Sequence, residues 1–228
     1  MKSLASASLL LAAINAQVAS AKIALAHFMV QESYAYTVDE WKLDIAAAQQ
    51  IGLDGFALNW IPPDCYPDDS SNSVQWQIGQ LRNAYAAADA SNPPFKLMHS
   101  FDMSYTSSQC DNLIWNQTFQ VQMINELASH TSQLKFNDEV LVSTYGGEQG
   151  PPYGVQYFQG LKSLVNAYFA PAFDGFSQGA RGGKGVTQAN SLIQQYPANA
   201  IDGFLNCKLP SFIFTLLSLT SNRGMLAV

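Results

Sequence analysis

The chain has few charged residues and no surplus of basic ones. Lysine, arginine, aspartate and glutamate make up 12% of the 228 residues, and the formal net charge is −6. Proteins that bind nucleic acid carry a basic patch, and helices that lie on a membrane carry a basic face. The composition therefore predicts no nucleic-acid partner and no membrane partner. An uncharged, polar ligand fits it better.

The motifs of metal and cofactor chemistry are also missing. There is no CxxC pair, and the three histidines are scattered, so a zinc site is not expected. The glycine-rich segment Gly179–Gly185 lacks the GxxxxGK[ST] spacing of a phosphate loop. No GxSxG elbow is present, and no lysine stands at a strand end for Schiff-base chemistry. We therefore predict that the protein uses no metal and no organic cofactor.

Cysteine is scarce and odd in number, which is unusual for an exported protein. Cys65 and Cys110 fall in loops predicted to follow neighbouring strands, and a disulfide between them is a hypothesis. That pairing would leave Cys207 without a partner. Asn116-Gln-Thr118 matches the acceptor pattern for N-glycosylation, so Asn116 is a candidate glycosylation site.

No apolar run is long enough to span a bilayer, which needs about 20 residues. The run at the start, Leu4–Ile14, follows Lys2 and precedes the small residues Ala19-Ser20-Ala21. A charged start, a short apolar stretch and a small-residue cleavage site are typical of a secretory signal peptide. We predict cleavage near Lys22 and secretion to the cell wall or the medium, rather than a membrane anchor.

Strand and helix patterns alternate along the chain. Helices are predicted where apolar residues recur at helical spacing, as for Trp41, Ile45 and Ala48. Short apolar runs bounded by turn signals predict strands. The predicted strands are Ile23–Met29, Gly55–Trp60, Lys96–Phe101, Glu139–Tyr145, Tyr168–Phe173 and Ile201–Asn206, and the predicted helices are Thr37–Ile51, Val74–Ala88, Leu113–His130, Gln156–Ala167 and Thr187–Tyr196.

This alternation predicts an α/β fold with a parallel sheet, of the (β/α)8 TIM-barrel type. About six strands are found where a closed barrel needs eight, so the barrel is predicted to be incomplete here. An open, doubly wound sheet is the alternative, but no glycine-rich fingerprint follows the first strand. The predicted organisation is a signal peptide at residues 1–21, a partial barrel at 22–206 and a tail at 207–228.

The tail differs in character from the rest. Cys207–Leu219 is apolar without a helical period, and Ser221–Val228 has no turn signals. A glycolipid-anchor signal is one alternative, but the spacer and small-residue site that it needs are poor. We expect that the tail is not part of the native fold and that a translated intron or a shifted frame produced it.

Polar groups that follow parallel strands meet at one edge of a barrel and face the substrate. Asp54 and Asp202 precede strands and are predicted to be structural. The groups that follow strands are His27, Asn59, Trp60, Asp64, Tyr66, Asp102, Tyr145, Glu148 and Asp174. Two carboxyl groups with amides and aromatic faces suit the hydrolysis of a glycosidic bond. We predict Asp102 and Asp64 as the catalytic candidates and the others, apart from Asp174, as substrate contacts. A turn at Asp64 and a core position for His27 are the structural alternatives.

Several segments together resemble a known family. They are Ala26–Val30, Tyr36–Trp41, Asp54–Asn59, Lys96–Tyr105, Val142–Glu148 and Ile201–Phe204. In this order and spacing they are similar to glycoside hydrolase family 71, the fungal α-1,3-glucanases or mutanases. The resemblance implies a TIM-like barrel followed by a β-sandwich region, secretion, and endo-hydrolysis of α-1,3-glucan without a cofactor. It also implies an inverting mechanism, with carboxyl groups about 6.5–9.5 Å apart.

The chain departs from the family after Asn206. Members continue with a Trp-containing segment and later carry a Trp-Asn-Asp-x-Gly-Glu motif whose acidic residues form the main catalytic pair. That motif is missing here, so Asp102 and Asp64 are expected to be auxiliary, and the general acid and base are not assigned.

The sequence thus predicts a secreted, monomeric glycosidase by descent, with α-1,3-glucan as its partner. We expect this form to be inactive or unstable, because a barrel without two strands leaves unpaired backbone edges. The alternatives are a non-catalytic α-glucan-binding remnant that keeps the sugar-facing loops, and an unrelated barrel enzyme that acts on a small neutral metabolite.

Overall fold

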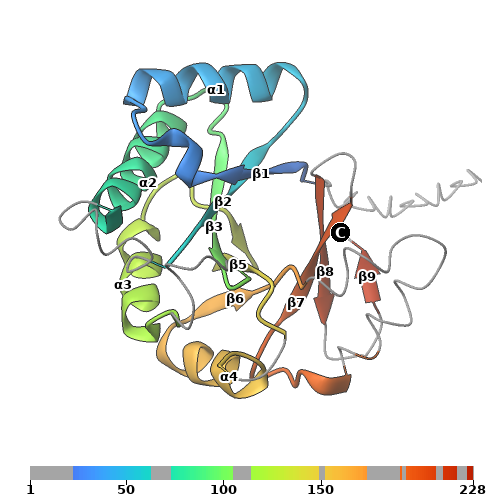
Figure 1. Cartoon of the computed structure of the whole chain (residues 1–228). Coiled ribbons are helices and arrows are strands. Elements are labelled where there is room, and N and C mark those ends of the chain that lie inside the picture. The colour runs from blue at the N-terminus through green and yellow to red at the C-terminus, as the bar shows by residue number, and fades with distance from the viewer. Residues whose placement is uncertain are drawn as a thin grey trace, which may run out of the picture.

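The protein forms an α/β fold in which helices α1 to α4 surround a parallel sheet (Figure 1). The computed structural model describes residues 23–62, 73–104, 114–148, 152–173, 191, 194–208, 213–219 and 225–227. The helices are η1 (Val30–Ser33), α1 (Val38–Gln50), α2 (Ser73–Asp89), α3 (Gln117–Leu127) and α4 (Val155–Leu164). The strands are β1 (Leu25–Met29), β2 (Gly55–Trp60), β3 (Lys96–Asp102), β4 (Lys135–Phe136), β5 (Glu139–Tyr145), β6 (Ala167–Phe169), β7 (Gly203–Lys208), β8 (Ile213–Leu219) and β9 (Met225–Ala227).

The main sheet has the strand order β1-β2-β3-β5-β6, and each of these pairs is parallel. Each step along the sheet therefore requires a crossover, and a helix lies in every one of them. The carboxyl ends of these strands consequently lie at the same edge. The prediction of a parallel α/β sheet is confirmed.

The two faces of the sheet bury different sets of side chains. One face packs against the helices and carries the large aromatic and aliphatic groups, among them Phe56, Leu58 and Trp60 of β2. The other face carries a second apolar cluster, which includes Ala57, Met98, Leu141, Tyr168 and Leu205. Alternation along a strand sends successive side chains to opposite faces, and this explains the division. We call the second face the inner face.

The first helix begins where its sequence specifies. Thr37 caps it, because its side-chain oxygen accepts from the backbone N–H of Glu40 at 3.3 Å while the Glu40 carboxylate accepts from the N–H of Thr37 at 2.7 Å. Gly52 follows the helix with a φ of +84°, a conformation that glycine adopts without strain. The helix therefore lies within the predicted range Thr37–Ile51.

The predicted sixth strand is present as β7, and it runs alongside the end of β6. The backbone N–H groups of Asp202 and Leu205 donate to the carbonyls of Phe169 and Pro171, at 2.8 and 3.0 Å. Because both sets of residue numbers rise together, β7 runs in the same direction as β6. Strands β8 and β9 then follow antiparallel to β7 and β8, and β8 lies against β1 on the far side of the sheet from the helices (Figure 1).

The hairpin of β4 and β5 was not predicted, and neither were the antiparallel strands β8 and β9. Strand β4 pairs antiparallel with β5 and is joined to it by Asn137 and Asp138, whose φ angles are +51° and +66°. Two successive residues of positive φ are typical of a tight hairpin turn, which Asn and Asp tolerate. Other boundaries are shifted: β6 ends at Phe169 rather than Phe173, α3 spans Gln117–Leu127 rather than Leu113–His130, and α4 ends at Leu164 rather than Ala167. Most of the predicted helix Thr187–Tyr196 lies outside the described residues.

Candidate functional site

The inner face becomes polar near the edge of the sheet at which the parallel strands end, which we call the carboxyl edge. Asn59 of β2 is in register with Ser100 of β3, and Ser100 is in register with Ser143 of β5. All three side chains are buried and lie on the same face, two residues beyond the apolar positions Ala57, Met98 and Leu141. The inner face thus changes from an apolar layer to a layer of amide and hydroxyl groups. We call Asn59, Ser100 and Ser143 the polar layer.

A carboxylate and a phenol follow one step closer to the edge. Asp102 of β3 is in register with Tyr145 of β5 and shares the face of the polar layer. Asp102 is only 6% exposed, whereas Tyr145 is half-buried. The structure therefore brings together Asn59, Asp102 and Tyr145, as predicted for groups that follow neighbouring strands.

Asp102 is held by hydrogen bonds to its side-chain carboxylate and to its backbone carbonyl. Its carboxylate accepts a hydrogen bond from the N–H of Ser104 at 3.0 Å, which fixes the turn after β3. Its carbonyl oxygen accepts from the indole N–H of Trp115 at 2.7 Å. Trp115 in turn packs against Phe101 and Trp60, with ring centroids 5.0 and 4.9 Å away. The aromatic core behind the sheet thus positions the carboxylate on its front.

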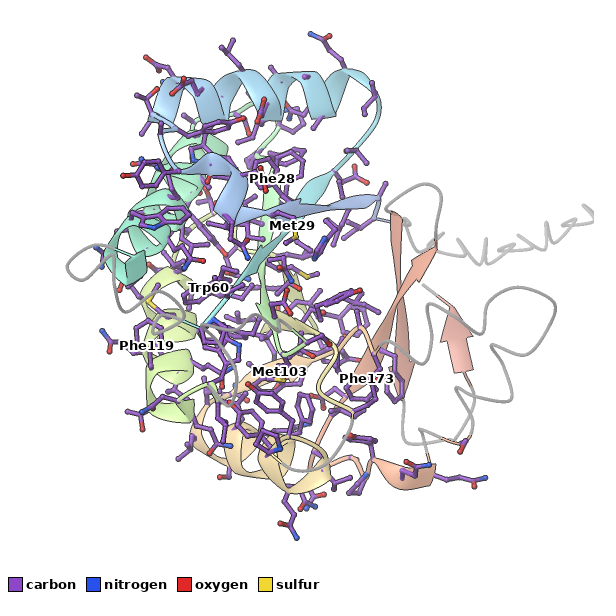
Figure 2. The ribbon with its side chains drawn as sticks, in the orientation of Figure 1. Phe28, Met29, Trp60, Met103, Phe119 and Phe173 are labelled. Atoms are coloured by element: carbon purple, nitrogen blue, oxygen red, sulfur yellow. The ribbon has the colours of Figure 1, made fainter. Side chains whose placement is uncertain are left out.

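Trp60 belongs to that core and not to the inner face, which corrects its predicted position as a substrate contact. Its side chain is fully buried and points toward α3, where the ring of Phe119 lies 5.9 Å away (Figure 2). The reason is that Asn59 and Trp60 are neighbours in a strand, so they occupy opposite faces. Trp60 acts on the site through Trp115, and we leave it out of the proposed substrate contacts.

Asn59 is the most unusual polar group of the site. Its residue is 0% exposed, and neither its side-chain oxygen nor its nitrogen has a hydrogen-bond partner within the part of the chain that the structure describes. A buried amide without partners costs about 1–3 kcal/mol in a protein. Such a group is an anomaly in a stable fold, and a ligand that donates and accepts hydrogen bonds would relieve it.

His27 joins the site from the opposite end of the sheet. Its imidazole lies 5.8 Å from the phenol ring of Tyr145, centroid to centroid. Burial lowers the pKa of His27 to about 4, so the ring is neutral at ordinary pH. A neutral imidazole offers one donor and one acceptor.

The turn after β5 is packed tightly against the turn after β3. Gly146 and Gly147 have φ angles of +69° and +95°, and a Cβ added to Gly146 would lie 1.7 Å from the side-chain oxygen of Ser104. Glu148 follows directly, and its carbonyl oxygen accepts from the hydroxyl of Tyr196 at 3.0 Å. Glu148 therefore follows a turn that packs on Met103 and Ser104, and its backbone is anchored by Tyr196.

The two aspartates that precede strands are structural, as predicted. The carboxylate of Asp54 accepts from the N–H of Ala24 at 2.7 Å. That of Asp202 pairs with Lys162 and accepts from the N–H of Phe169 at 3.0 Å.

Other predicted residues lie outside the described residues, namely Asp64, Cys65, Tyr66, Cys110 and Asp174. Their roles, and the disulfide, stay predictions. Asn116 is exposed and caps α3, because its side-chain oxygen accepts from the N–H of Phe119 at 3.2 Å. Cys207 lies within β7. Among the described ranges, no cluster of three or more histidines, cysteines or acids could hold a metal ion, and no helix is long and apolar enough to cross a membrane.

Sequence reasoning missed Ser100 and Ser143. Each lies two residues before the end of its strand, where a predicted site residue stands: Asp102 after Ser100, and Tyr145 after Ser143. Period-2 alternation read backwards from those residues would have found them.

A comparison with known protein families assigns the chain to one of them. The family model described as "Glycosyl hydrolase family 71" matches residues 20–208, so the chain belongs to that family. The resemblance seen in the sequence is confirmed.

Curated relatives agree with this assignment. Glucan endo-1,3-alpha-glucosidase agn1 of Schizosaccharomyces pombe is 33% identical over 168 residues, which cover 70% of this chain and 35% of that protein. A mutanase of Penicillium rubens is 30% identical over 66% of this chain and 32% of its own length. The ascus wall endo-1,3-alpha-glucanase of Schizosaccharomyces pombe is 28% identical over 88% of this chain and 41% of its length. The chain thus spans about a third to two fifths of the relatives that it matches.

Proposed function

We propose that this protein is a secreted, monomeric glycosidase that hydrolyses α-1,3-glucan of fungal cell walls by a two-carboxylate, inverting mechanism. Family membership supports the substrate, because two relatives carry endo-1,3-alpha-glucanase or glucosidase in their names and the third is called a mutanase. The single observation that carries the proposal within this chain is the polar layer with Asp102 and Tyr145 above it. Neutral donors and acceptors that surround one carboxylate suit an uncharged sugar.

Each group has a proposed role. The Asp102 carboxylate accepts hydrogen bonds from sugar hydroxyls, together with Asp64, and both are auxiliary to the acid and base that break the glycosidic bond. Asn59 donates and accepts at a hydroxyl, while Tyr145 and His27, together with Tyr66, make further contacts to the substrate. Glu148, in its anchored turn, lies at the rim. Cleavage itself needs one protonated and one ionised carboxyl group on opposite sides of the bond.

We also propose that the sheet is the major part of a TIM-like barrel. Two observations support this. Two strands, β2 and β3, separate β1 from β5, and three strand spacings in a flat sheet amount to about 14 Å; the 5.8 Å between the rings of His27 and Tyr145 requires the sheet to curl. Strand β7 also continues the parallel direction beside β6.

The division into residues 1–21, 22–206 and 207–228 stays part of the proposal. Its support is the change after Asn206: the βα repeat ends, and β8 and β9 pair antiparallel. Cleavage near Lys22, a glycan on Asn116 and a Cys65–Cys110 disulfide complete the proposal for the secreted chain.

The proposal is tested with purified protein and insoluble α-1,3-glucan, with insoluble β-1,3-glucan as the control polymer. Release of reducing ends from the α-linked polymer alone supports hydrolysis. Selective retention on it without release supports the alternative function, a glucan-binding module. Equal behaviour on both polymers, or none on either, contradicts both functions.

A further inference from the structure

An aromatic pair, of which one ring is exposed and the other half-buried, lies at the carboxyl edge, outside the polar layer. Tyr34 follows η1, directly after β1, and Trp76 lies in the first turns of α2, which follows β2. Their rings are 5.2 Å apart and nearly perpendicular, at 83°. Tyr34 is 65% exposed. Both residues come from connections that leave the carboxyl ends of neighbouring strands, so the pair stands on the same edge as Asn59 and Asp102.

The backbone beneath Tyr34 is fixed to α2. Gln80 lies one helical turn after Trp76 on the same face of α2, and its side-chain amide donates to the carbonyls of Tyr36 and Tyr34 at 3.0 and 3.4 Å. The amide oxygen of Gln80 accepts from the indole N–H of Trp41 at 2.8 Å, which locks its orientation. The exposed ring of Tyr34 is therefore presented by an anchored segment rather than by a free loop.

The fold gains little stability from this arrangement unless the rings also bind a ligand. A large aromatic side chain that is ordered and still exposed gains little from burial in the fold. Edge-to-face packing does not cover both faces of the two rings, and Tyr34 remains 65% exposed. The axial C–H groups of a pyranose ring form a weakly polarised apolar face, which packs well on an aromatic face. A neutral partner also suits the chain, because its surface carries few charges.

We propose that Tyr34 and Trp76 form a binding subsite for a glucosyl unit of the α-1,3-glucan chain, next to the units held by the polar layer. The inference rests on the proposed function. The pair lies at the carboxyl edge that also carries Asn59 and Asp102, and this position favours the glucan itself over a separate protein partner. The subsite grips the polymer through stacking and takes no part in the cleavage chemistry, so it affects KM and retention rather than kcat.

The deciding variants separate stacking from hydrogen bonding. We expect Tyr34→Leu to weaken retention on insoluble α-1,3-glucan about threefold to tenfold. Tyr34→Phe keeps the ring and should be retained as well as the wild type. Leu43→Ala is the matched control, because Leu43 is 70% exposed on α1 and lies away from this edge. Trp76→Phe and Trp76→Leu should repeat the contrast.

A second readout uses the protein's own fluorescence. Of its four tryptophans, Trp41, Trp60 and Trp115 are buried, so a soluble quencher such as acrylamide reports mainly on Trp76. A soluble α-1,3-linked glucose oligosaccharide should protect this fluorescence in the wild type and not in Trp76→Phe.

Three outcomes are distinguishable. If the wild type is retained and both leucine variants match Leu43→Ala, the subsite is wrong and the proposed function stands. If the wild type is not retained on α-1,3-glucan at all, both the proposed function and the subsite are wrong. If Tyr34→Leu lowers the melting temperature but binds normally per folded molecule, the pair is structural and the subsite is again overturned.

Discussion

His27 and Tyr145 face each other across the inner side of the sheet, with ring centroids 5.8 Å apart and a tilt of 38°. They belong to β1 and β5, which are not neighbours in the sheet. The sheet curls enough to bring the two rings together. The imidazole of His27 is also partly buried, and this burial has a consequence for stability.

The first prediction concerns acid. Burial lowers the pKa of both His27 and His99 from 6.5 to about 4. The unfolded chain therefore binds more protons than the folded one between these values, and stability must fall as the pH drops from 6.5 toward 4. For the fully buried His99 the loss by pH 4.5 is roughly 2–3 kcal/mol. The carboxylate of Asp89, whose pKa hydrogen bonds lower to about 2, adds its own loss only below this window.

Urea unfolding at pH 7.5 and 4.5 measures this dependence. His99→Phe should reduce the dependence of stability on pH. The phenyl ring suits this position, because the imidazole that it replaces stacks on Phe101 with centroids 5.4 Å apart. A wild type that is equally stable at both pH values would contradict the assignment of neutral, buried imidazoles.

The second prediction concerns Asn59. Replacement by leucine of similar size removes an amide that has no partner among the described residues, so Asn59→Leu should leave the free energy of unfolding unchanged or raise it by about 1 kcal/mol. The same change should abolish selective retention on α-1,3-glucan. Most substitutions of buried residues destabilise, so a stable but non-binding variant would be diagnostic. A loss of more than about 2 kcal/mol would show that the amide is satisfied within the fold.

A third prediction tests the turn that holds Glu148 beside Asp102. Gly146→Ala forces a Cβ to within 1.7 Å of the Ser104 hydroxyl oxygen at a φ of +69°, so the two turns must separate. We expect a loss of about 2–3 kcal/mol and of glucan binding together. Gly79→Ala in α2 is the control, because nothing lies within 4 Å of its Cβ, and it should stabilise by about 0.5–1 kcal/mol. Equal, small effects of both changes would mean that the turn is not tightly packed.

The fourth prediction separates the two possible uses of Asn116. Asn116→Asp keeps the helix cap and removes the glycosylation acceptor, and Thr118→Ala removes the acceptor while leaving the cap intact. Both should abolish a glycan-dependent shift in electrophoretic mobility of the secreted protein. Only Asn116→Ala should also cost about 1 kcal/mol of stability, through the lost cap. If the secreted wild type shows no glycan-dependent shift in mobility, the prediction of a glycan on Asn116 is wrong.

Much of the fold could be predicted because the strands are short apolar runs with polar ends. The edge at which Asn59, Asp102 and Tyr145 meet followed from parallel strand order alone. The face on which a strand-end residue lies did not, because Asn59 and Trp60 both end β2 and only one of them points inward. Deciding between them requires the alternation to be anchored at a known core position, such as Leu58.

Other features depend on contacts that no local pattern encodes. The β4–β5 hairpin is too short for a period-2 signal, and its turn residues Asn137 and Asp138 resemble any polar loop. The bond from Trp115 to the Asp102 carbonyl joins segments 13 residues apart across a turn. The contact between His27 and Tyr145 needs the curl of the whole sheet, which arises from tertiary packing.

The most direct test is the thermal stability of the purified protein with a soluble α-1,3-linked glucose oligosaccharide. A ligand that binds only the folded state raises the melting temperature in proportion to its occupancy. The wild type should shift with the α-1,3-linked ligand and not with its β-1,3-linked counterpart, while Asp102→Asn and Asn59→Leu should shift with neither. An equal shift in the wild type and both variants, or in both ligands, would contradict a glucan site built on the inner face of this sheet.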